Sequence, residues 1–152
     1  MRANGPAWVH RLEWVIAFAG ALPFAIATAA MLWGDSHIRV PAIAALVTVS
    51  AIAISHLGGI EAGLAILDAN ATAATRTIAI AMGVITSTAA WGVLWLPSPQ
   101  WQLGTSLGLF VATWAADLGL SRHGLVPAWF VDLRTAITAL VAVILGIALY
   151  LL

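Results

Sequence analysis

The sequence predicts an all-α protein, namely a polytopic membrane helix bundle of five transmembrane helices. The first observation is composition: of 152 residues, 62% are hydrophobic and only 8% are charged. A soluble globular domain carries about 25% charged residues, so this chain could not cover its surface in water and needs lipid as its solvent. The net charge is zero and no basic patch is evident, which argues against a nucleic-acid partner.

The second observation is a set of long apolar stretches. A helix that spans a bilayer needs about 20 mostly apolar residues. Stretches of that kind lie at about 14–33, 40–67, 77–96, 101–119 and 133–152. The segments between them are too short to hold a soluble domain, so we expect residues 1–152 to form a single membrane domain.

The stretch at 40–67 is unusually long. As one straight helix it would measure about 42 Å, against a hydrocarbon core of about 30 Å. It must therefore tilt, extend beyond the membrane interface, or break, and Gly58–Gly59 is the place where a break is expected.

The third observation is the distribution of arginines, which predicts orientation. With five spans, the N-terminal tail and the second and fourth loops lie on one side, and they hold Arg2, Arg11, Arg76, Arg122 and Arg134. The other side holds only Arg39. Because positive residues favour the cytoplasmic side, we expect a cytoplasmic N-terminus and a periplasmic C-terminus in a bacterial inner membrane.

The N-terminal segment allows a second interpretation, a cleaved signal peptide with Arg2 and Arg11 before an apolar run. The apolar run continues to Trp33, which is longer than a signal core needs, so we favour a first membrane span.

Missing residue types exclude several kinds of chemistry. The chain has no Cys, so thiolate metal sites and Cys nucleophiles are excluded, and no Lys, so Schiff-base chemistry is excluded. No zinc-protease, nucleophile-elbow or phosphate-loop motif is present. We therefore expect no metal and no cofactor, and a membrane enzyme is the last of the function classes that we consider.

Charged and polar residues gather at the cytoplasmic ends of the predicted spans. An ionisable group inside lipid is costly and usually has a partner or a task. One interpretation is a polar binding pocket, and the one that we favour is a set of ion pairs that hold the helices together. The candidate residues are His56, Glu61, Asp68, Arg76, Asp117 and Arg134.

Within this group, we expect Glu61 to pair with an arginine of another span, with Arg134 preferred and Arg76 second. The alternative is that Glu61 is unpaired and carries a proton. For His56, a proton relay, a quinone hydrogen bond or a haem ligand are all conceivable, but we favour a hydrogen bond to a carbonyl across a helix contact.

Small residues recur every four positions at Ser55, Gly59 and Gly63. Such a stripe lets helices approach closely, so we predict that it faces another helix with almost no gap.

Three strings carry a resemblance to a known family. Residues 20–24 (Gly-Ala-Leu-Pro-Phe) resemble its Gly-x-x-Pro-Phe element, and residues 55–65 resemble its Ser-Phe-Leu-Gly-Gly-x-x-Trp-Gly element. Asp117 followed by residues 124–134 is similar to its C-terminal Asp…Gly-Leu-x-Pro-x-Trp-Tyr…Leu-Arg element. The chain thus resembles the uncharacterised group similar to transmembrane protein sixty-nine, found in proteobacterial and mitochondrial inner membranes.

The chain departs from that group at three positions. His56 stands where an aromatic residue is usual, Ala62 where tryptophan is usual, and Glu61 where a basic residue is common. The resemblance implies no activity. It supports an uncleaved first span, because the Gly-x-x-Pro-Phe element lies inside it.

Together these observations favour a small integral inner-membrane protein that acts as a structural or assembly subunit. Its expected partners are the lipid bilayer and other membrane proteins or further copies of itself, which its small-residue faces would contact. The alternative is a transporter or binder of a small molecule or lipid headgroup that uses the cytoplasmic-side polar cluster.

Overall fold

The computed structural model describes residues 7–67, 72–122 and 126–152. Within these ranges it contains no strand and five α-helices: α1 (Ala7–Trp33), α2 (Ser36–Leu67), α3 (Ala73–Val93), α4 (Pro99–Arg122) and α5 (Ala128–Tyr150). Each helix is long and apolar enough to cross a membrane. The predicted fold class, an all-α bundle of five potential membrane spans, is confirmed.

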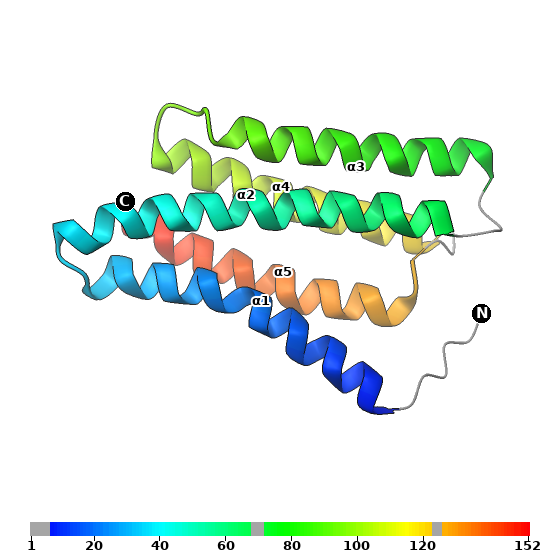
Figure 1. The fold of residues 1–152 in the computed structure, drawn as a ribbon, viewed down its shortest axis with the longest axis horizontal. Helices are drawn as coiled ribbons and strands as arrows, with labels where there is room; N and C mark the ends of the chain where they lie inside the picture. The colour runs from blue at the N-terminus through cyan, green and yellow to red at the C-terminus, as the bar shows by residue number, and fades with distance from the viewer. Residues whose placement is uncertain (1–6, 68–71, 123–125) are drawn as a thin grey trace.

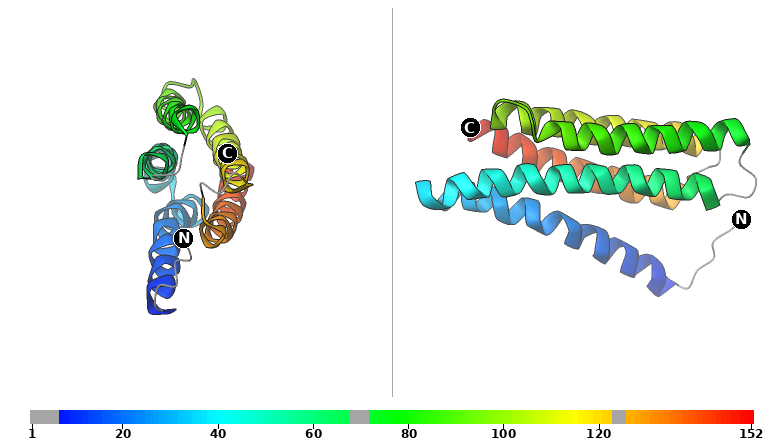
Figure 2. Two further views of the ribbon diagram at one scale, coloured as in Figure 1. Left: turned by 90° about the vertical axis from the view of Figure 1, so that its right-hand side faces the viewer. Right: turned by 45° about the horizontal axis from the view of Figure 1, so that its top comes forward.

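The helices form two layers, which Figure 2 shows in its end-on view. One layer contains α1, α2 and α3, and the other contains α4 and α5. Helix α2 packs against α1, α3 and α4, whereas α5 packs against α1 and α4. This arrangement matters for the charged residues, because a side chain on α2 meets α4 more directly than α5.

Helix α2 runs without a break from Ser36 to Leu67. Its 32 residues correspond to a length of about 48 Å, well above the roughly 30 Å of a hydrocarbon core. Of the three expected outcomes, the break at Gly58–Gly59 is therefore wrong. The helix must instead tilt or extend past the membrane interface.

Helix α1 turns away from the bundle in its N-terminal half (Figure 1). Pro23 lies inside this helix. Proline has no N–H to donate to the carbonyl four residues earlier, and its ring crowds that carbonyl, which bends helices. The divergence leaves a space between the first half of α1 and the rest of the bundle.

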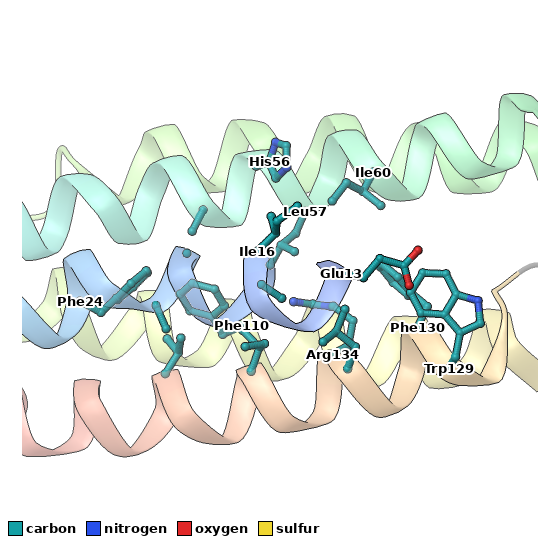
Figure 3. A pocket seen from close by; sticks show the side chains of 17 residues that line it. Glu13, Ile16, Phe24, His56, Leu57, Ile60, Phe110, Trp129, Phe130 and Arg134 are labelled. Atoms are coloured by element: carbon teal, nitrogen blue, oxygen red, sulfur yellow. The ribbon is translucent and has the colours of Figure 1, made fainter. Parts of the chain in front are cut away.

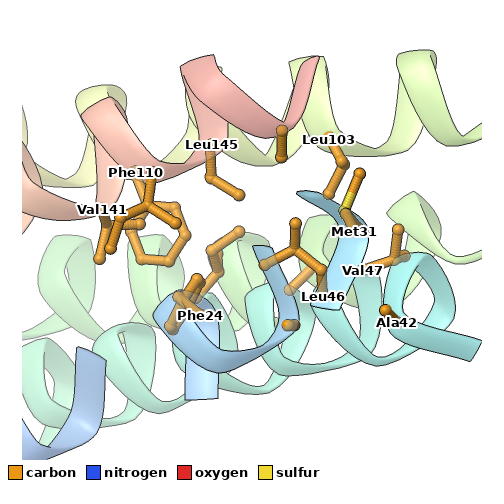
Figure 4. Close-up of a cluster of buried hydrophobic side chains, with 14 residues drawn as sticks. Phe24, Met31, Ala42, Leu46, Val47, Leu103, Phe110, Val141 and Leu145 are labelled. Atoms are coloured by element: carbon orange, nitrogen blue, oxygen red, sulfur yellow. The ribbon is translucent and has the colours of Figure 1, made fainter. Parts of the chain in front are cut away.

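A cluster of buried apolar side chains forms the core of the bundle (Figure 4). The largest fully buried apolar side chains come from all five helices and are Phe24, Leu46, Ile54, Val93, Leu103, Val141 and Leu145. They lie toward the end at which α1 joins α2, which we call the apolar end. The opposite end, where α2 ends and α3 begins, holds Glu61, Asp117 and Arg134 and is called the charged end.

A close backbone contact between two helices joins Gly58 of α2 to Gly83 of α3. A Cβ atom built on Gly58 would lie 2.7 Å from the Gly83 carbonyl oxygen and 3.1 Å from the Thr86 Cβ. The Ser87 hydroxyl also donates a hydrogen bond of 3.3 Å to the Ser55 carbonyl across this contact. The two backbones meet here because neither glycine carries a side chain.

The predicted packing stripe at Ser55, Gly59 and Gly63 is therefore not the face of α2 that makes the close contact with α3. A Cβ atom on Gly59 or Gly63 would meet no atom of the described chain within 4 Å. Gly58 is one residue before Gly59, and one residue rotates a helix by about 100°. Of the three stripe residues, only Ser55 takes part in the α2–α3 contact, through its backbone carbonyl.

The two neighbouring glycines give a matched test of this contact. Gly58→Ala places a Cβ against the Gly83 backbone, and such overpacking should lower the free energy of unfolding by about 1–3 kcal/mol. Gly59→Ala meets no atom and should leave stability unchanged or raise it by up to about 1 kcal/mol, because alanine favours helices over glycine. Thermal unfolding in detergent measures both, and equal effects of the two variants would refute the contact.

Candidate functional site: a buried charge cluster beside an apolar cavity

A buried ion pair joins α4 to α5 at the charged end. The Arg134 Nε donates a hydrogen bond of 2.8 Å to Oδ2 of Asp117. A second guanidinium nitrogen, Nη2, donates to the Thr113 hydroxyl at 3.2 Å. Asp117 is 1% exposed and Arg134 is 5% exposed, so each charge depends on the other for its neutralisation.

The local sequence explains how these groups meet. Thr113 and Asp117 are four residues apart on α4 and therefore lie one turn apart on the same face. Arg134 lies in the second turn of α5, which is antiparallel to α4. The long arginine side chain reaches both oxygen atoms from the facing helix.

Glu61 is the third buried charge, and the expected Glu61–Arg134 pair is not what the structure contains. Glu61 is 3% exposed, and neither carboxylate oxygen has a hydrogen-bond partner among the described residues. Asp117 and Arg134 act on it electrostatically from the neighbouring helices. Arg134 pairs with Asp117 instead, because α5 packs directly against α4 and not against α2.

The other predicted site residues are more dispersed. Arg76 is half-buried near the start of α3 at the same end of the bundle. The His56 side chain is exposed on α2, so the predicted position inside a helix contact is wrong. Asp68 lies outside the described residues.

An apolar cavity of about 470 Å³ lies beside the charge cluster, between α1, α2 and α5. It occupies the space that the divergence of α1 leaves, and it is open on one side. Most of its lining is aliphatic or aromatic. The polar contributions come from Glu13, His56, Trp129 and Arg134.

The cavity has a polar end and an apolar end, as Figure 3 shows. Glu13, Trp129 and Phe130 lie together at one end. Phe24 and Phe110 lie toward the other end, where their rings meet edge to face at 6.0 Å between centroids. Arg134 lies between the two ends, so one member of the ion pair forms part of the cavity wall.

Within the described ranges, no group of three His, Asp or Glu side chains could hold a metal ion. What the site offers is an apolar chamber with one guanidinium in its wall and a buried carboxylate nearby. Such a site is suited to binding and to holding charge or a proton.

Sequence reasoning missed two kinds of functional residue. Thr113 could have been found, because it lies one helical turn from Asp117 on the same face. The cavity residues Glu13, Phe24 and Phe110 could not, because the cavity exists only where α1 leaves α2.

The fold defines the class of the protein. It is a helical integral membrane protein with five apolar helices long enough to span a bilayer. More particularly, the chain belongs to the DUF3429 family, described as proteins of unknown function, whose family model matches residues 9–150. No curated protein and no solved structure matches the chain.

The ion pair can be tested by removing one or both partners. Arg134→Met leaves Asp117 buried without a counter-charge and should cost about 3–5 kcal/mol of stability. The double variant Arg134→Met, Asp117→Leu removes both charges and should recover most of that loss. Arg122→Met, at an exposed position in the last turn of α4, serves as the control.

Unfolding in detergent measures all three variants. If Arg134→Met costs no more than Arg122→Met, or if the double variant is less stable than Arg134→Met alone, the pair does not hold α4 and α5 together.

Proposed function

We propose that this protein binds an amphipathic lipid molecule in the cavity between α1, α2 and α5. The observation that carries the proposal is the cavity itself, which is apolar along most of its length and polar at one end. Its volume of about 470 Å³ falls within the range of about 300–1,000 Å³ that is typical of small-molecule sites.

The open side of the cavity favours an occupant that comes from the bilayer. The cavity lies in a helix bundle whose large outward-facing side chains are apolar, among them Ile16 on the cavity wall. A molecule that enters such a cavity sideways, between the helices, would come from the hydrocarbon region. This supports a lipid rather than a water-soluble metabolite.

The two ends of the cavity match the two parts of such a molecule. An acyl or prenyl chain fits beside Phe24 and Phe110 at the apolar end. A polar head fits beside Glu13 and Trp129, since tryptophan favours the membrane interface. Arg134, which donates a hydrogen bond to Asp117, places a positively charged guanidinium in the cavity wall between the polar end and the apolar end.

A second candidate function is that of a structural or assembly subunit. It is favoured by the face of α2 that bears Ser55, Gly59 and Gly63. The described helices of this chain leave Gly59 uncovered, and a shallow hollow forms there between Ile52 and Ile60. A helix of another membrane protein, or of a second copy, could approach closely at that hollow.

The wider setting of the protein follows from the same reasoning. We infer that residues 1–152 form a single domain in a bacterial inner membrane, with the N-terminus in the cytoplasm. Five of the six arginines belong to the parts of the sequence that the predicted topology places on that side. A relationship to the transmembrane-protein-sixty-nine group is consistent with the three sequence elements, and it assigns no activity.

Filling the cavity tests the binding proposal. Gly20 lines the cavity, and a Cβ atom built on it would meet no atom within 4 Å. Gly20→Phe should therefore occupy the space without disturbing the fold and abolish lipid retention. Gly104→Phe, on α4 away from the cavity and equally uncrowded, should retain lipid as the wild type does.

Native mass spectrometry after purification in mild detergent measures the retained molecule and its mass. Equal retention by Gly20→Phe and wild type would contradict the proposal, and so would a wild type that carries no lipid-mass species. A bound species with the mass and absorbance of a prenylated quinone would support the proposal and identify the apolar part of the lipid as a prenyl chain.

The subunit function makes a separate prediction at Gly59. Gly59→Leu should weaken association with a partner or second copy and leave the melting temperature of the isolated chain unchanged. Gly146→Leu, an equally uncrowded position on α5, should leave association intact. Chemical cross-linking in native membranes measures both, and an identical cross-linking pattern for the two variants would exclude this face as an interface.

A further inference from the structure

Three carboxylate oxygens at the charged end have no hydrogen-bond donor among the described residues. They are both oxygens of Glu61 and Oδ1 of Asp117, and all three are inaccessible to solvent. A carboxylate that is buried without a donor or counter-charge is so costly that it takes up a proton instead. We therefore expect a carboxyl group at this site to carry a proton.

The charges at this site do not balance if both acids are ionised. Arg134 supplies one positive charge and is bonded to Asp117. Glu61 and Asp117 supply two negative charges, and they act on each other electrostatically. One proton makes the group neutral. That proton also supplies an O–H donor at a site where three carboxylate oxygens have no hydrogen-bond donor among the described residues.

We propose that Glu61 is a proton-binding site inside the membrane, next to the Asp117–Arg134 pair. The proton belongs on Glu61 rather than on Asp117, because Arg134 donates a hydrogen bond to Asp117 and none to Glu61. A metal cation in its place is disfavoured, since three acidic or imidazole side chains do not converge within the described part of the chain.

The other charged groups on the elements packed against α2 do not neutralise Glu61 through a hydrogen bond. Glu13 of α1 and Arg76 of α3 lie at the same end, and each has interactions of its own. His56, on α2 itself, is exposed. Asp117 of α4 and Arg134 of α5 are the groups that act on Glu61.

This inference is independent of the lipid proposal, because Glu61 does not line the cavity. The two are adjacent through Arg134, which lines the cavity and bonds Asp117. Buried carboxyl groups that bind protons within membrane helices mark proton pathways in transport proteins. A proton at Glu61 would thus give the protein a response to pH beside its cavity.

Dicyclohexylcarbodiimide tests the proposal directly, because this apolar reagent adds to a carboxyl group only in its protonated form. The purified wild-type protein in lipid nanodiscs should gain one adduct, located at Glu61 by tandem mass spectrometry, and the yield should fall as pH rises. Glu61→Gln should lose the adduct. Asp132→Asn, which changes an exposed carboxylate of α5, should keep it.

Infrared spectroscopy gives a second readout that needs no reagent. The wild type should display the carbonyl stretch of a protonated carboxylic acid at neutral pH, and Glu61→Gln should remove that band. If Glu61→Gln fails to fold, the position of the carbodiimide adduct in the wild type still tests whether Glu61 is the protonated carboxyl group. An adduct on Asp117 instead of Glu61, no adduct at any pH, or a band that survives Glu61→Gln would overturn the proposal.

Discussion

The ion pair between Arg134 and Asp117 determines how α4 and α5 meet inside the membrane. Neither charge could remain ionised at that depth alone, because a charged group in lipid needs a partner. With Nε and Nη2 bonded to Asp117 and Thr113, the guanidinium holds the two helices at one height relative to each other. The same side chain forms part of the cavity wall and acts on Glu61.

The two halves of the bundle are stabilised in different ways. Toward the apolar end, aliphatic and aromatic side chains from neighbouring helices pack closely around Leu46 and Leu145. Toward the charged end, the bend of α1 near Pro23 removes a packing partner, and a cavity remains. The glycine contact between α2 and α3 keeps α2 in place beside that cavity. A cavity can persist here because the surrounding helices are held by other contacts.

The cavity and the proposed proton site are adjacent through Arg134. Arg134 faces the cavity and is neutralised by Asp117, and Glu61 lies close enough to both to feel their charges. A change of protonation at Glu61 alters the electrostatic field around Arg134, which a polar head in the cavity would experience. Binding in the cavity would in turn change the cost of ionising Glu61, since linkage between two sites is reciprocal.

The sequence alone determined the membrane class, the five spans and the gathering of charge at one end, because each follows from local composition and from antiparallel helices with short connections. Only the tertiary structure decided that Arg134 pairs with Asp117, because that choice depends on which helices are neighbours. It also decided that Gly58 and not Gly59 meets α3, because one residue rotates a helix face by about 100°. The cavity likewise depends on how far α1 diverges from α2, which Pro23 alone does not specify.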